Sequence, residues 1–245
     1  MSKSQFRNPA RTRSSGYPGP VPGAATTLPS ASVEDYLKAI YSLGKSGDRV
    51  ATTELAERLG FAPSSASAMI SRLAESGLVD HVRYSGVRLT AAGEREALRV
   101  IRRHRLLEAF LVSSLDISWD QVHVYAEQLE HAASDELIDV IAAKLGDPTV
   151  DPHGDPIPTR ELTIDEGGAE MLADLAPGER ATLIRVSDSD PEMLRYLAER
   201  EIGIGEEVEM VGRQPFEGPC EIRIAERTHQ LPLVIAAAIR VRRDS

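Results

Sequence analysis

The stretch 52-TTELAERLGFAPSSASAMISRLAESG-77 carries two short helix patterns separated by a tight turn. The first pattern ends at Gly60, because glycine readily adopts the left-handed conformation that closes a helix. Pro63 can begin the second helix at its first position, where the missing N–H costs no hydrogen bond. Gly77 ends that second pattern. We therefore expect two packed helices, of which the second covers residues 63–76.

A hairpin is predicted directly after them, over residues 78–90, with its turn at Ser85–Gly86. Helix, turn, helix and two-stranded ribbon is the order of a winged helix-turn-helix domain. In that domain the second helix enters the major groove and the ribbon contacts phosphates. The candidate DNA-binding residues are Pro63, Ser64, Ser65, Ser67 and Arg72 of the second helix and Arg83 and Arg88 of the hairpin. The same pattern also fits a helical module that binds protein rather than DNA.

A metal-ligand pattern lies further along the chain, in 123-HVYAEQLEH-131. On a helix, His123, Glu127, Glu130 and His131 share one face, because residues three, four and seven apart are neighbours. Imidazoles and carboxylates together suit Mn(II), Fe(II), Co(II), Ni(II) or Zn(II). Upstream, His104 and Glu108 form a second pair at the i,i+4 spacing. One such cluster could be a solvated helix face, but two on neighbouring helices indicate a divalent-metal site.

Composition limits the class of protein. The chain has 245 residues, 42% of them hydrophobic, and a single cysteine, Cys220, so neither an internal disulfide nor a cysteine-based zinc site is expected. We find no apolar run long enough to span a membrane and no signal peptide, and expect a cytoplasmic protein that does not contact membranes. The formal net charge of −10 does not by itself indicate nucleic-acid binding. Only residues 1–30 are basic without any acid, and their prolines predict a disordered tail.

The remaining helix patterns surround these motifs. We expect helices at 33–43, 91–114, 119–132 (with Ser118 as its cap) and 135–145. Their apolar residues exceed what one thin bundle would bury, which favours a homodimer. Residues 147–160 form a proline-rich linker. His153 in that linker could be a metal ligand, but a structural role is favoured.

Beyond the linker the period of the sequence changes. Short alternating runs at 181–186, 207–211, 220–224 and 230–233, interrupted by a single helix at 191–200, indicate a small β-barrel of the SH3-like type. The fold class is therefore mainly α with a small β domain. Predicted domain bounds are 1–30 tail, 31–92 winged helix-turn-helix, 93–146 helical dimerisation and metal-binding domain, 147–175 linker and 176–245 SH3-like domain.

Five motifs together resemble the diphtheria toxin repressor family of metal-dependent transcriptional regulators. They are 34-EDYLKAIY-41, 63-PSSAS-67, 103-RHRLLE-108, 123-HVYAEQLEH-131 and 151-DPHGDPIP-158. The resemblance implies a homodimeric repressor of metal-uptake genes, active in metal homeostasis, which binds double-stranded operator DNA when its metal is present.

The family's ligands can be carried onto this chain residue by residue. The primary site would fall on Asp35, Glu127, Glu130 and His131. The ancillary site would fall on His104, Glu108 and His123, completed by Asp188 of the barrel or, as a second choice, Asp190. Iron sensors of the family have Met and Cys where Asp35 and Glu127 stand, and harder oxygen ligands favour Mn(II).

The resemblance thus implies the manganese-responsive branch, with an iron(II)-dependent repressor as the alternative. Co, Ni, Zn or Cd would also bind in vitro. One departure is Lys38, at a position where some manganese regulators have Glu, so two separate sites are expected rather than a binuclear one.

No nucleophile constellation, phosphate loop or HExxH motif is present. A metal-dependent enzyme and a metal buffer remain the rivals from other classes. Without metal, we expect the facing carboxylates to repel one another and loosen the winged domain.

Overall fold

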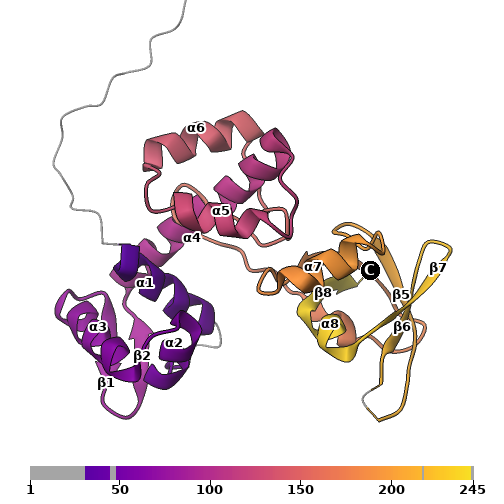
Figure 1. The fold of residues 1–245 in the computed structure, drawn as a ribbon, viewed down its shortest axis with the longest axis horizontal. Coiled ribbons are helices and arrows are strands. Elements are labelled where there is room, and N and C mark those ends of the chain that lie inside the picture. The colour runs from indigo at the N-terminus through magenta and orange to yellow at the C-terminus, as the bar shows by residue number, and fades with distance from the viewer. Residues whose placement is uncertain (1–30, 45–47, 217, 244–245) are drawn as a thin grey trace, which may run out of the picture.

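The computed structural model describes residues 31–44, 48–216 and 218–243, so the predicted tail 1–30 lies outside the described residues. Three units follow one another along the chain, with the long helix α4 joining the first to the second (Figure 1). In chain order the elements are α1 (Ala31–Leu43), α2 (Thr52–Leu59), α3 (Pro63–Glu75), β1 (Val79–Val82), β2 (Gly86–Leu89), α4 (Ala91–Leu115), α5 (Val122–Leu129), α6 (Asp135–Leu145), β3 (Glu170–Met171), a 3-10 turn (Leu172–Asp174), β4 (Arg180–Val186), α7 (Pro191–Ala198), β5 (Glu207–Arg213), β6 (Cys220–Ile224), β7 (Arg227–Leu231), α8 (Leu233–Ala238) and β8 (Ile239–Arg243). The expected fold class, mainly α with a small β domain, is confirmed.

The first unit is a winged helix-turn-helix. α2 ends at Gly60, whose φ of 69° is the left-handed cap that the sequence predicts, and Pro63 opens α3. Leu55 of α2 and Ile70 of α3 are fully buried, so the two helices pack through their apolar faces. β1 and β2 pair antiparallel to form the wing. At Gly86, where φ is 94°, a Cβ would lie 2.4 Å from the carbonyl oxygen of Val50, so only glycine fits.

The second unit is helical and is organised around α4. This helix has 25 residues, a length of about 37 Å at 1.5 Å per residue, and it contacts α1 as well as α5 and α6. Thr90 caps it by accepting a hydrogen bond from the Gly93 N–H. Leu106 and Ala126 lie in the core that α4 shares with α5 and α6. α4 thus carries its side chains from the winged domain into the helical domain.

The helix expected over residues 119–132 is shorter than predicted. α5 covers only Val122–Leu129, and the Ser118 carbonyl, not its side chain, accepts the N–H groups of Gln121 and Val122. Ser134, the cap of α6, is extended, with φ −75° and ψ 155°. Glu130 is the C-cap of α5 and keeps helical geometry, with its N–H bonded to the Ala126 carbonyl, and His131 lies in the turn that follows.

The proline-rich segment after α6 is well packed rather than a loose linker. Asp151 accepts hydrogen bonds from the N–H groups of His153 and Asp155, at 2.8 and 2.9 Å. His153 is fully buried, and its carbonyl accepts the N–H of Val186 in β4 at 2.9 Å. Gly154 approaches β4 so closely that a Cβ would lie 2.0 Å from the Ile184 carbonyl oxygen. The segment therefore fixes the start of the barrel against the helical unit.

The third unit is one antiparallel sheet with strand order β3-β8-β4-β5-β6-β7. Figure 1 shows α7 and α8 beside these strands. The prediction of one helix in this region is wrong, since α8 is a second one, and strands β3 and β8 were not expected. Within the described ranges, no helix combines the length and the apolar character needed to cross a membrane.

Candidate metal centres

The expected primary site brings together three of its four residues. Asp35 comes from α1 of the winged domain, whereas Glu130 is the C-cap of α5 and His131 lies in the turn after it. His131 Nε2 lies 3.0 Å from Asp35 Oδ1 and 3.6 Å from Glu130 Oε1. Glu130 is fully buried. Burial raises the pKa of Asp35, and the charges of Glu127 and Glu130 raise it further against the opposing effect of His131.

The fourth expected residue, Glu127, faces elsewhere. Its Oε1 accepts a hydrogen bond of 2.6 Å from Lys38 Nζ. The Glu127 carboxylate lies close to the Glu130 carboxylate and the His104 imidazole, and the three form a separate group of possible ligands. Lys38 also donates to both oxygens of Glu130, each at 3.0 Å. Metal-free carboxylates were expected to repel one another here, and the charges of Glu127 and Glu130 do act this way on Asp35. The Lys38 ammonium offsets that repulsion between Glu127 and Glu130. Burial would lower the pKa of Lys38, but the charges of Glu130 and Glu127 outweigh it and raise that pKa.

Glu34, which the sequence analysis did not assign to the site, contacts the His131 imidazole of the primary cluster. Its Oε2 lies 2.6 Å from His131 Nδ1, and its Oε1 accepts from Arg103 Nη1 at 3.1 Å. Both Glu34 and Arg103 are buried, and Arg103 also pairs with Asp135 at 2.8 Å. A carboxylate that receives the second N–H of an imidazole fixes the tautomer and leaves Nε2 free for a metal. The only sequence signal was an acidic residue directly before Asp35.

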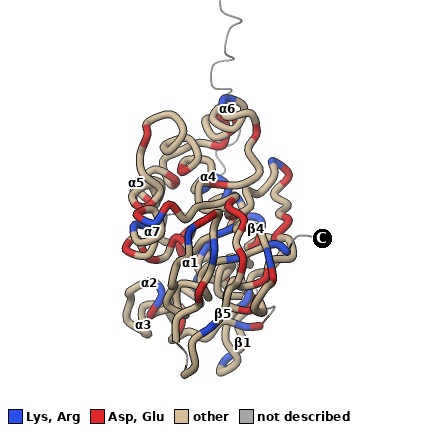
Figure 2. Tube along the Cα trace, turned by 90° about the vertical axis from the view of Figure 1, so that its right-hand side faces the viewer, with Lys and Arg blue, Asp and Glu red and all other residues tan. Residues whose placement is uncertain are grey.

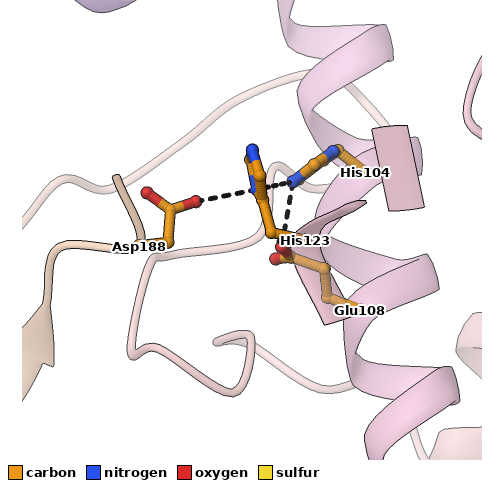
Figure 3. Close-up of side chains that lie close together, drawn as sticks. All are labelled: His104, Glu108, His123 and Asp188. Atoms are coloured by element: carbon orange, nitrogen blue, oxygen red, sulfur yellow. Dashed lines mark hydrogen bonds and ion pairs between the residues drawn. The ribbon is translucent and has the colours of Figure 1, made fainter. Parts of the chain in front are cut away.

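The four residues of the expected ancillary site lie together. Figure 3 shows His104 and Glu108 on α4, His123 on α5, and Asp188 reaching them from the loop after β4. His104 Nε2 is 3.0 Å from Glu108 Oε1 and 3.1 Å from His123 Nδ1, and His123 Nδ1 is 3.2 Å from Asp188 Oδ2. Asp190, the second choice for this position, is not grouped with the cluster and caps α7 by accepting the N–H groups of Glu192 and Met193.

Charges in this cluster compensate one another. The hydrogen bonds to Asp188 and Glu108 raise the pKa of His123 to about 10. Burial would raise the pKa of Asp188, but its hydrogen bond and ion pair with His123 lower that pKa to about 2. The positive charge of His123 thus compensates the carboxylates around it.

The geometry fits a metal at both clusters. Each group places its ligand atoms within 4.8 Å of one another. Bonds of about 2.0–2.2 Å separate opposite ligands by up to about 4.4 Å, so small side-chain adjustments suffice. In the ancillary cluster Glu108 Oε2 is buried and has no hydrogen-bond partner. Two imidazole nitrogens and two carboxylates, with no sulfur, make a donor set for a borderline or hard divalent cation.

The two clusters are in direct contact through His104. Its Nε2 faces Glu108 of the ancillary cluster, and its Nδ1 lies 2.5 Å from Glu130 Oε2 of the primary cluster. A ligand at Nε2 requires the proton to be on Nδ1, from which it is donated to Glu130. Substitution of His104 therefore disturbs both clusters, so Asp188 is the better residue for testing the ancillary cluster alone.

A third group, which the sequence analysis did not identify, adjoins the ancillary cluster. Glu108, Asp151 and His153 are all buried and place their ligand atoms together. His153 Nε2 donates to the Trp119 carbonyl at 2.7 Å, which agrees with the favoured structural role, while its Nδ1 faces Glu108 Oε2 at 3.7 Å. Burial raises the pKa of Asp151 to about 7. Asp151 had no sequence signal besides its place in the DPHG motif.

The expected DNA-binding residues lie on an exposed face of the winged unit. Ser64, Ser65, Ser67 and Arg72 are exposed on α3, and Pro63 is exposed at its start. Arg83 lies in the β1–β2 turn, 4.9 Å from the ring centroid of Tyr84, which is 92% exposed. Arg88 on β2 pairs with Asp80 at 3.1 Å. Figure 2 shows acidic and basic residues interspersed along the trace.

Comparison with known protein families agrees with all three units. Residues 30–87 match the model of the iron dependent repressor N-terminal DNA binding domain. Residues 90–159 match the iron dependent repressor metal binding and dimerisation domain, and residues 171–243 match the FeoA domain.

Individual relatives point the same way. The iron-dependent repressor IdeR of Mycobacterium tuberculosis strain H37Rv is 32% identical over 156 residues, 63% of this chain and 64% of that protein, so less than two thirds of its length is matched. The diphtheria toxin repressor of Corynebacterium diphtheriae is 30% identical over 196 residues, 74% of this chain and 84% of that protein. A solved manganese-dependent transcriptional repressor in complex with manganese is 44% identical, with a TM-score of 0.82 over 86% of this chain and 100% of that one.

The winged helix-turn-helix, the helical unit with its two ligand clusters and the SH3-like unit are matched in this order by the three family models. The relatives agree with that match. This chain therefore belongs to the diphtheria toxin repressor family of metal-dependent regulators.

Proposed function

We propose that this protein is a metal-activated DNA-binding transcriptional repressor and that Mn(II) is its activating metal. One observation carries the proposal: the primary cluster is divided between two units. Asp35 belongs to α1 of the winged domain, whereas Glu130 and His131 belong to the helical domain, and His131 Nε2 approaches Asp35 Oδ1 to 3.0 Å. A cation shared by these side chains, when bound, would supply the charge that holds the two units in one arrangement.

That arrangement would determine DNA affinity through the position of α3. In a dimer, two recognition helices must reach successive major grooves about 34 Å apart. α1 packs on α2 and α4, so a constraint at Asp35 is transmitted to the helix-turn-helix through buried contacts such as those of Leu37 and Ile40. A ligand shifts such an equilibrium only through its higher affinity for one arrangement. Asp35 provides this difference, since it is the ligand that comes from the moving unit.

The choice of Mn(II) rests on the donor atoms. Asp35, Glu127, Glu130 and His131 offer oxygen and imidazole but no sulfur, and Mn(II) is well suited to carboxylate oxygens. The manganese-dependent repressor named above is also the relative with 44% identity. Iron(II) is the second candidate, because IdeR is named an iron-dependent repressor and the two matching N-terminal family models are those of iron dependent repressors.

Two surfaces would serve the repressor. The exposed hydroxyls of α3 and the arginines of the wing would contact bases and phosphates of double-stranded operator DNA. A second copy of the chain would cover the apolar side chains that α5 and α6 leave exposed, which are Val124, Tyr125, Leu129, Leu137 and Val140. The match to a dimerisation domain over residues 90–159 supports this use of α5 and α6.

The test is binding of the full-length protein to its own promoter DNA, measured by fluorescence anisotropy at matched free Mn(II) and Fe(II) concentrations. Wild-type protein should bind only with metal, and at lower free Mn(II) than free Fe(II). Asp35→Ala should fold and dimerise but lose metal-dependent DNA binding. Asp174→Ala, which removes an exposed acid of the barrel, should behave as wild type.

Other outcomes would favour the rival classes. Equal DNA affinity with and without metal would refute the gating model. Metal binding without any preference for promoter DNA would identify a metal buffer instead. Metal-dependent turnover of a small molecule would identify an enzyme.

A further inference from the structure

We infer that Lys38 is a tethered cation that competes with the activating metal for Glu127 and Glu130, and thereby sets the metal concentration at which the protein responds. The inference rests on the proposed metal activation and adds a residue that tunes its threshold without being a ligand.

The surroundings of the Lys38 ammonium resemble a coordination sphere. Nζ lies 2.6 Å from Glu127 Oε1, 3.0 Å from each oxygen of Glu130 and 3.2 Å from His104 Nδ1. Both carboxylates belong to the expected primary ligand set, and Glu130 is fully buried. The ammonium therefore takes up the negative charge that a divalent cation would otherwise neutralise.

Metal binding requires an exchange of these contacts. Glu127 is not grouped with Asp35 and His131, and its Oε1 accepts from Lys38 Nζ at 2.6 Å, so its movement toward them weakens this contact. Glu130 already lies 3.6 Å from His131 Nε2, yet both of its oxygens accept from Lys38. The free energy of the ammonium contacts is thus lost when metal binds and lowers the apparent affinity.

Competition of this kind has a distinctive signature. The contacts that must break are the same whichever divalent cation binds, so all cations lose affinity by one common factor. Selectivity among metals stays with the donor atoms, whereas the threshold depends on Lys38. One charge-assisted hydrogen bond to a carboxylate corresponds to about tenfold in an equilibrium constant.

The experiment measures binding of Mn(II) and of Co(II) to the full chain without DNA, by isothermal titration calorimetry, together with thermal unfolding of the metal-free protein. Lys38→Met removes the charge and keeps the length of the side chain. Both dissociation constants should fall by about tenfold and by the same factor. The metal-free variant should unfold at a lower temperature than wild type, because Glu127 and Glu130 lose their counter-charge.

Two variants complete the design. Lys144→Met removes one positive charge from an exposed position on α6 and should leave both dissociation constants unchanged. Should Lys38→Met fail to fold, Lys38→Gln removes the same charge with a polar side chain and gives the same readout. Weaker metal binding by the neutral variants, or a tightening for one metal only, would overturn the inference, and so would an equal tightening in Lys144→Met. If wild-type protein binds neither metal, the proposed function fails instead, so the two failures are distinguishable.

Discussion

Glu34→Gln should weaken metal binding although Glu34 is not itself one of the expected ligands. Glu34 joins two buried partners: Oε2 lies 2.6 Å from His131 Nδ1, and Oε1 accepts from Arg103 at 3.1 Å. Glutamine keeps the size and one acceptor oxygen but removes the charge, so it no longer fixes the His131 tautomer as strongly. Loss of a partner of this kind weakens metal binding about 10–100-fold, which corresponds to about 1.4–2.8 kcal/mol.

The same substitution has a separate cost in the metal-free protein. Arg103 is 1% exposed, and breaking a buried ion pair by removing one partner costs about 3–5 kcal/mol. Asp135 also pairs with Arg103, at 2.8 Å, but its side chain is 54% exposed. Since Arg103 keeps that second partner, we expect a loss of stability below this range.

Calorimetric titration of Mn(II) and thermal unfolding of the metal-free protein measure the two effects independently. Glu170→Gln is the matched control, because it removes a carboxylate that pairs with Arg243 at 2.7 Å on the barrel and belongs to neither cluster. Wild-type Mn(II) affinity in Glu34→Gln, combined with lower thermal stability, would refute the reasoning. Glu34 would then serve only to neutralise Arg103.

Two further outcomes are expected. Asp188→Ala should loosen the β4–α7 loop from the helical unit, since Asp188 contacts His123 at 3.2 Å. Metal should then protect this loop less from hydrogen exchange, whereas primary-site affinity should stay near wild type. Unchanged protection would contradict a role for Asp188 in joining the loop to the helical unit. Arg83→Ala on the wing should weaken DNA binding similarly across sequences and reduce the slope of log affinity against log salt concentration by about one. Anisotropy titrations at several salt concentrations measure this slope. An unchanged slope would show that Arg83 contacts no phosphate.

Local sequence was sufficient for most helix bounds. Gly60 and Gly146 end α2 and α6 with φ of 69° and 78°, and Pro63 opens α3. Such signals are readable because a cap depends on the backbone conformation of one or two residues. The spacing of His104 and Glu108 placed both on one face of α4 for the same reason. Ligand types and their helical spacing were therefore predictable from the chain alone.

Only the tertiary structure decided how distant residues meet. β3 and β8 pair residues about seventy positions apart, as in Glu170 with Val241, and no local pattern specifies such a register. The sequence marked Lys38 only as a departure from a Glu that some manganese regulators have there, yet it lies between two carboxylates that follow it by 89 and 92 positions. Glu34 likewise acquires its role from His131 and Arg103. The identity of a side chain limits what it can bind, whereas the packing of α1 and α5 against α4 decides which partner it reaches.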